Sequence, residues 1–140
     1  MKIFLKLFTS AFLSALLFGV CEGIFSMIEN YYEISAFDNF VLGFTIGSLV
    51  SFLFYLTIGI LFFYLNFKVT NKVKPNNPYA FGLFMYSLLG LLVGCALLYS
   101  SQAYFYFMDT LYFIGTGLLV SNIFYHVLHL MNVLAKRKAV

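Results

Sequence analysis

The stretch from Phe40 to Phe67 contains no charged residue, and it limits the fold more than any other feature of the sequence. An α-helix rises about 1.5 Å per residue, so a helix of this length is longer than the roughly 30 Å hydrocarbon core of a bilayer. A chain of 140 residues has no aqueous fold that could bury such a segment completely. The stretch therefore predicts a helix that crosses a membrane with some tilt.

Three further apolar runs resemble this one, and together they predict an all-α protein, an integral membrane four-helix bundle. Apolar residues make up 63% of the chain and charged residues 9%, as expected where lipid is the main solvent. The first run follows Lys2 and Lys6, as in a signal peptide or signal anchor, but no A-x-A cleavage site follows it, so we expect a retained helix. We predict a single transmembrane domain over residues 1–140, with spans near residues 3–28, 40–67, 80–104 and 111–135.

The charged residues are distributed unequally between the predicted connections, and this distribution predicts the orientation. All five acidic residues fall on or near the side of the first connection. Under the positive-inside rule, a multi-pass protein of the cell (plasma) membrane with four spans then has both termini in the cytoplasm. The basic residues occupy the N-terminus, the second connection and the C-terminus: Lys2, Lys6, Lys68, Lys72, Lys74, Lys136, Arg137 and Lys138.

Small residues recur every four positions in the first span, which predicts a helix face that another backbone can approach closely. These are Ala11, Ala15, Gly19 and Gly23. The sequence also contains two internal similarities, which we call the sequence echoes: residues 47–55 resemble residues 117–125, and residues 15–19 resemble residues 90–94. The echoes have two explanations: two parallel helical-hairpin repeats, or chance similarity among sequences rich in Leu, Phe and Gly.

Acidic residues follow the end of the first span at helical spacing. A helix that continued past the membrane would carry Glu22, Ser26, Glu29 and Glu33 on one face. Glu22 lies about 28 Å along the helix from Ile3, close to the far interface. The stripe is either a solvated connection with one glutamate at the interface, or a ligand- or partner-binding surface for a cationic peptide or a membrane-protein partner.

The fourth span carries a polar stripe on one face. Asn122, His126, His129 and Asn132 follow the spacing i, i+4, i+7 and i+10. Ionisable residues within a membrane are costly and usually face protein or water, so the stripe is a second candidate ligand-binding site. Hydrogen bonding between helices or a position at the interface is the alternative.

Several classes of function lack any supporting pattern in the sequence. No C-x-x-C and no Cys/His ligand spacing predicts a metal site, so we expect neither a metal nor a cofactor; Cys21 and Cys95 are either free or paired. No nucleophile–base pair or phosphate-binding loop is present, and the histidines and Glu22 lie at opposite depths, so we expect no catalytic residues and no enzyme. The basic residues flank spans, where anionic lipid explains them without nucleic acid.

The chain as a whole resembles uncharacterised small four-span membrane proteins of Bacillus and its relatives. A basic connection, the sequence Asn76-Asn77-Pro78 and the run Phe84-Met-Tyr-Ser-Leu-Leu-Gly-Leu-Leu92 make the region Tyr55 to Leu92 similar to immunity proteins against pore-forming bacteriocins. This resemblance implies a non-catalytic protein in the lipid bilayer that binds another membrane component or peptide, of an immunity or accessory type. Four spans with one carboxylate also resemble the small multidrug exporters, which implies the alternative of a transporter or channel subunit working as a homo-oligomer.

Overall fold

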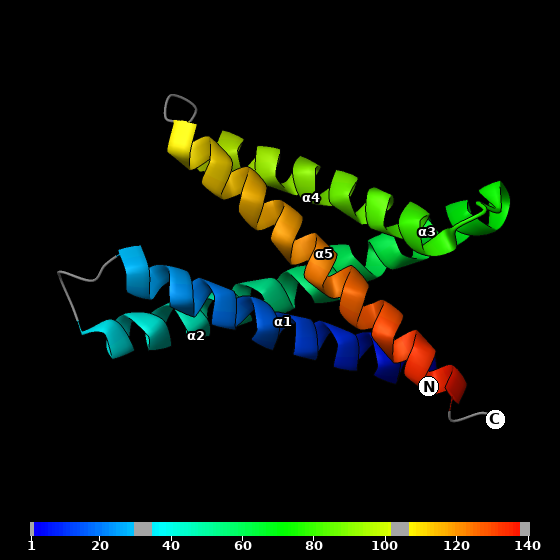
Figure 1. The fold of residues 1–140 in the computed structure, drawn as a ribbon, viewed down its shortest axis with the longest axis horizontal. Coiled ribbons are helices and arrows are strands. Elements are labelled where there is room, and N and C mark those ends of the chain that lie inside the picture. Colours follow the sequence, from blue (N-terminus) through cyan, green and yellow to red (C-terminus); the bar gives the residue numbers. More distant parts are fainter. Residues whose placement is uncertain (1, 30–34, 102–106, 138–140) are drawn as a thin grey trace.

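The computed structural model describes residues 2–29, 35–101 and 107–137, and every regular element within these ranges is helical (Figure 1). Helix α1 covers Lys2–Glu29. A long helical rod follows, made of α2 (Ala36–Phe54), one π-helical segment η1 (Tyr55–Gly59) and α3 (Ile60–Val73). Helices α4 (Pro78–Ser101) and α5 (Phe107–Arg137) complete the described fold. The prediction of an all-α fold is confirmed.

Four of the helical stretches are long and apolar enough to cross a membrane: Ile3–Ile28, Ala36–Val73, Pro78–Ser100 and Thr110–Leu134. They correspond to the four predicted spans, but the second is longer than the predicted range of 40–67. Lysines in its last turns do not end the helix, because an exposed lysine side chain is compatible with helical backbone. At 38 residues the rod is about 57 Å long, well beyond a hydrocarbon core of roughly 30 Å.

Local sequence explains where the rod begins and where it ends. Ser35 caps α2, since its hydroxyl accepts a hydrogen bond from the backbone N–H of Asp38 at 3.2 Å. At the other end Lys74 adopts a left-handed conformation with φ of 49°, and its N–H donates to the carbonyl of Thr70 at 2.8 Å. The chain therefore turns immediately after α3.

Helix α4 begins at the point where its sequence favours a helix start. Pro78 occupies its first position, where the missing N–H of proline costs no hydrogen bond. The side-chain oxygen of Asn77 accepts from the N–H of Ala80 at 3.1 Å, and its carbonyl accepts from the N–H of Phe81 at 3.1 Å. The basic connection thus reverses the chain between α3 and α4.

The helices form two hairpins, α1 with α2 and α4 with α5, and α5 crosses the α2–α3 rod near its middle (Figure 1). The core lies at this crossing. Tyr55 is fully buried, its ring stacks on Phe124 with centroids 5.0 Å apart, and its hydroxyl donates to the carbonyl of Val120 at 2.9 Å. Tyr86 of α4 packs against the same cluster, with its ring centroid 5.1 Å from that of Phe62.

Glycines allow the backbones to approach closely within each hairpin. A Cβ atom added to Gly43 would lie 2.7 Å from the carbonyl oxygen of Glu22, so α1 and α2 are in backbone contact there. A Cβ atom added to Gly94 would lie 2.7 Å from the Cα atom of Ile114, which places α4 and α5 equally close. The predicted packing role of the small-residue stripe is therefore seen at Gly19 and Gly23, while Ala11 and Ala15 belong to the core.

The outer surface of the helices is strongly apolar. Phe4, Leu61 and Leu92 are 68%, 70% and 66% exposed, and similar side chains occur along all of the helices. Soluble monomers rarely expose contiguous apolar surface on this scale. Lipid or another apolar surface is the environment that these side chains fit.

Candidate functional site

Two hollows open at opposite ends of the molecule, and we name the ends by their charges. The acidic end carries Glu22 and Asp38, and the basic end carries Lys68, Lys72 and Lys74. The hollow at the acidic end lies between the two hairpins; we call it the acidic-end cleft. It has a main part of about 330 Å³ and a side part of about 280 Å³. Five residues line both parts: Phe18, Glu22, Phe25, Tyr112 and Thr116.

Glu22 is the acidic group of this cleft, and its half-buried side chain lies between the hairpins. The Tyr112 hydroxyl donates a hydrogen bond to Glu22 Oε2 at 3.3 Å, which links α1 to α5. The Tyr112 ring also packs on Phe25, with the centroids 5.2 Å apart. A Cβ atom on Gly47 would lie 2.7 Å from the Cβ of Glu22, so the glycine leaves room for the glutamate. The carboxylate is thus held in place among mainly apolar walls.

The other acidic residues of the predicted stripe are placed only in part. Ser26 lines the cleft together with Glu22. Glu29 is the last residue of α1, and its side chain is not among those described. Glu33 lies outside the described residues. The structure therefore brings one predicted acidic site residue into a cavity and leaves the extent of the stripe as a prediction.

The polar residues predicted on the fourth span do not form one site. Asn122 faces α4, where its Oδ1 accepts a hydrogen bond from the Ser87 hydroxyl at 3.2 Å. Its Nδ2 donates to the Leu118 carbonyl of its own helix at 3.0 Å. His126 pairs through Nδ1 with the Tyr79 hydroxyl at 3.0 Å. These contacts between α4 and α5 match the alternative of hydrogen bonding between helices. Asn122 is therefore part of the helix packing.

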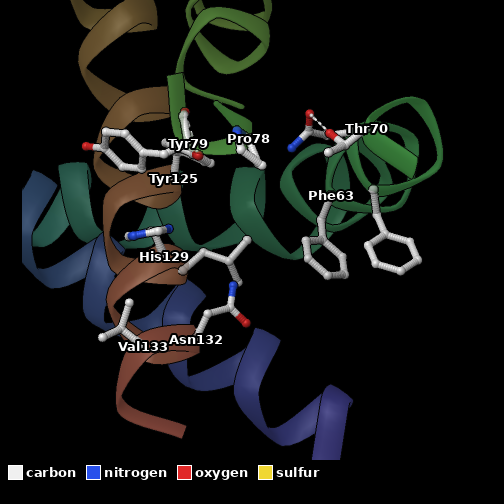
Figure 2. A pocket seen from close by; sticks show the side chains of 11 residues that line it. Phe63, Thr70, Pro78, Tyr79, Tyr125, His129, Asn132 and Val133 are labelled. Carbon is white, nitrogen blue, oxygen red and sulfur yellow. Dashed lines mark hydrogen bonds between the residues drawn. The ribbon is translucent and has the colours of Figure 1, made fainter. Parts of the chain in front are cut away.

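His129 and Asn132 instead line the second hollow, which we call the basic-end cavity. It has a volume of about 340 Å³. Figure 2 shows His129 and Asn132 of α5 on one side, Thr70 of α3 across from them, and Pro78 and Tyr79 at the start of α4. The remaining lining residues are Phe63, Asn66, Phe67, Tyr125, Leu128 and Val133.

Sequence reasoning did not identify Asn66, Thr70 or Tyr79 as site residues. The signal for the first two is their i, i+4 spacing at the end of the rod, where the Thr70 hydroxyl donates to Asn66 Oδ1 at 3.5 Å. Tyr79 has no such signal, because its contact with His126 joins residues 47 positions apart in the chain. Only the fold places them together.

The two hollows are separate sites. They lie on either side of the packed crossing at Tyr55 and Phe124, so Glu22 and His129 do not act on one substrate together. Among the described residues, no group of three or more His, Cys, Asp or Glu side chains could hold a metal ion. Cys21 and Cys95 are both free and exposed.

Comparisons with protein-family models, with curated proteins and with solved structures found no match.

Proposed function

We propose that the chain is a non-catalytic integral membrane protein that binds a cationic peptide, or a basic segment of a membrane-protein partner, in the acidic-end cleft. Its four apolar helices and apolar surface support insertion into a bilayer. The basic residues at the termini and the second connection support a multi-pass protein of the cell membrane with both ends in the cytoplasm. The acidic-end cleft then opens toward the outside.

One observation carries the binding role: the half-buried Glu22 carboxylate lies in a mainly apolar cleft between two hairpins, held by the Tyr112 hydroxyl. A carboxylate in surroundings of low polarity attracts a cation more strongly than one in water. The apolar walls contribute contact with the apolar part of the same ligand. An amphipathic basic helix combines the two features, which fits the immunity or accessory type of function.

The test uses the full-length protein in lipid nanodiscs and a synthetic amphipathic Leu/Lys peptide as the probe. We expect Glu22→Gln to weaken peptide binding about tenfold, because it removes one close charge pair. Added salt should reduce the difference only in part, because exposed charges are screened beyond about 8 Å at physiological ionic strength whereas a half-buried close pair is screened less. Glu29→Gln and Glu33→Gln should each weaken binding further if the stripe extends the surface.

Two controls make this test specific. Asp38→Asn removes a carboxylate at the same end of the molecule but outside the cleft, so it should leave peptide affinity unchanged. A peptide with Gln in place of every Lys should bind weakly to all variants. Binding of the Lys peptide that neither salt nor Glu22→Gln alters would refute capture by this carboxylate.

A transporter or channel subunit is the second candidate, and the pair of hollows favours it. They open at opposite ends and are separated by the packed crossing. A transporter would need a movement of the hairpins that opens the crossing to each hollow in turn. Such a subunit would work as a homo-oligomer, with Glu22 exchanging protons. Proteoliposomes would then show substrate-dependent proton flux that Glu22→Gln abolishes, whereas the binding role predicts no flux.

We also infer that the two hairpins derive from parallel repeats. The echoed positions make equivalent contacts: a Cβ on Gly47 would lie 3.4 Å from the Cα of Gly19, and one on Gly117 would lie 2.9 Å from the Cα of Gly94. The sequence echo pairs Gly19 with Gly94 and Gly47 with Gly117. In each hairpin the two helices thus approach each other at an equivalent pair of glycines.

A further inference from the structure

The basic-end cavity contains polar groups that lack hydrogen-bond partners among the described residues. Among the described residues, no hydrogen bond joins the ring nitrogens of His129 or the side-chain amide of Asn132 to another group. The Asn66 oxygen accepts from Thr70, which leaves its Nδ2 group as a donor without a protein partner. All three side chains are only partly exposed, and all three line the same cavity. Because these donors line an open cavity and have no acceptor among the described residues, the cavity fits a ligand that accepts hydrogen bonds.

The depth of the cavity follows from the length of the helices. A helix crosses the hydrocarbon core in about 20 residues. Counting from Thr110, where the apolar part of α5 begins, His129 and Asn132 lie at the opposite interface. Pro78, where the apolar part of α4 begins, lines the cavity as well. Two helices therefore place the cavity at the level of the lipid headgroups.

The end of the molecule that holds the cavity is basic, although no charged residue is among those that line the cavity. Exposed Lys68 and Lys72 each follow a lining residue of α3 by two positions, so they lie on the other side of this helix, and exposed Lys74 follows directly. Lys136 and Arg137 form the end of α5, in the turn after Asn132 and Val133. Basic groups next to a cavity between transmembrane helices favour anionic lipid headgroups.

The apolar part of the cavity wall fits the acyl chains of a lipid. Phe63, Phe67, Leu128 and Val133 line it beside the polar groups. In Figure 2 Phe63 of α3 lies across from Val133 of α5, with Asn132 between them. A phospholipid has this same division between an anionic headgroup and apolar chains, whereas a soluble phosphate has only the first.

We propose that the basic-end cavity binds an anionic phospholipid, with the phosphate accepting hydrogen bonds from Asn66, His129 and Asn132. The lysines at this end of the molecule supply longer-range attraction to the net negative charge. This assignment rests on the proposed membrane location but not on peptide capture by Glu22, which is at the other end of the molecule. Either binding can therefore fail without the other.

The experiment measures lipid binding to the full-length protein in detergent by native mass spectrometry. The probes are dioleoylphosphatidylglycerol, which is anionic, and dioleoylphosphatidylcholine, which is zwitterionic. We expect the anionic lipid to bind about tenfold more tightly, because each lysine near an anionic headgroup adds attraction. Equal affinity for the two lipids would overturn the proposal.

Variants locate the site. Asn132→Asp and Asn66→Asp keep the shape of the side chain but replace a donor by a negative charge, so each should weaken binding of the anionic lipid about tenfold. Asn71→Asp is the matched control: it introduces the same charge on α3 at an exposed position outside the cavity. It should change affinity less than about twofold. An equal loss in all three variants would indicate diffuse attraction and refute the site.

Two further measurements cover an Asp variant that does not fold and the binding of a soluble phosphate instead of a lipid. If an Asp variant does not fold, Asn132→Leu removes the donor without adding charge and should still reduce the preference for the anionic lipid. Glycerol 3-phosphate, added at the concentration of the lipid, should fail to displace it because it lacks the apolar chains. Displacement at equal concentration would assign the cavity to a soluble anion and overturn the lipid.

Discussion

At the residue scale, the sequence predicts the position of Glu22 along its helix but not its surroundings. That position depends only on helix rise, which is the same in every α-helix. The partner of Glu22 is Tyr112, 90 residues later in the chain, and the room for its side chain comes from Gly47 on a different helix. Such contacts depend on how the hairpins cross, and no local pattern in the sequence encodes that crossing.

Two buried tyrosines give a matched test of the core. The Tyr55 hydroxyl donates to the Val120 carbonyl at 2.9 Å, whereas the buried Tyr86 hydroxyl has no hydrogen-bond partner among the described residues. We expect Tyr55→Phe to destabilise the protein by about 1 kcal/mol, and Tyr86→Phe to stabilise it by a similar amount, because an unpaired buried hydroxyl is costly. The midpoint of thermal unfolding in detergent measures both. Equal shifts in the same direction would contradict the assigned hydrogen bonding.

At the element scale, the positions of the helices were predictable and their ends were less so. Long apolar runs predicted four spans, and the described residues contain four helical stretches that are long and apolar enough to cross a membrane. The second extends to Val73, since it is the left-handed conformation of Lys74 that ends it. The π-helical segment at Tyr55–Gly59 had no signal in the sequence. It lies where Gly59 approaches Phe124 of α5, which is again a tertiary contact.

Two glycines of the second hairpin test how far its close packing contributes to stability. A Cβ on Gly94 would lie 2.7 Å from the Cα of Ile114, while one on Gly115 would meet nothing within 4 Å. Gly94→Ala should separate α4 from α5 and destabilise the protein by about 1–3 kcal/mol. Gly115→Ala should be neutral or stabilise the helix by up to about 1 kcal/mol. The midpoints of thermal unfolding of the two variants in detergent, each compared with wild type, measure these effects. Equal effects would show that the close contact at Gly94 does not contribute to stability.

At the scale of the whole molecule, the candidate sites come from the arrangement of the hairpins. The polar stripe of the fourth span was one pattern in the sequence, but the fold divides it. Asn122 and His126 form hydrogen bonds with α4, whereas His129 and Asn132 line a cavity formed with α3 and the start of α4, where the His129 ring lies 4.7 Å from that of Tyr79. A stripe identifies residues that share a helix face, and it cannot tell which neighbour covers each part of that face.

The orientation of the whole molecule determines which hollow faces outward, and labelling of single cysteines tests it. Cys21 and Cys95 are first replaced by serine, and one cysteine is then introduced at Ser35 or at Asn71, both of which are exposed. Ser35 precedes α2 at the acidic end, and Asn71 lies among the lysines near the end of α3.

If basic residues face the cytoplasm, an impermeant thiol reagent added to intact cells should label Ser35→Cys and leave Asn71→Cys unlabelled. Asn71→Cys should react once the cells are opened, which shows that its thiol is accessible. Labelling of Asn71→Cys in intact cells would reverse the orientation, place the basic-end cavity outside, and remove the route by which an external cationic peptide reaches Glu22.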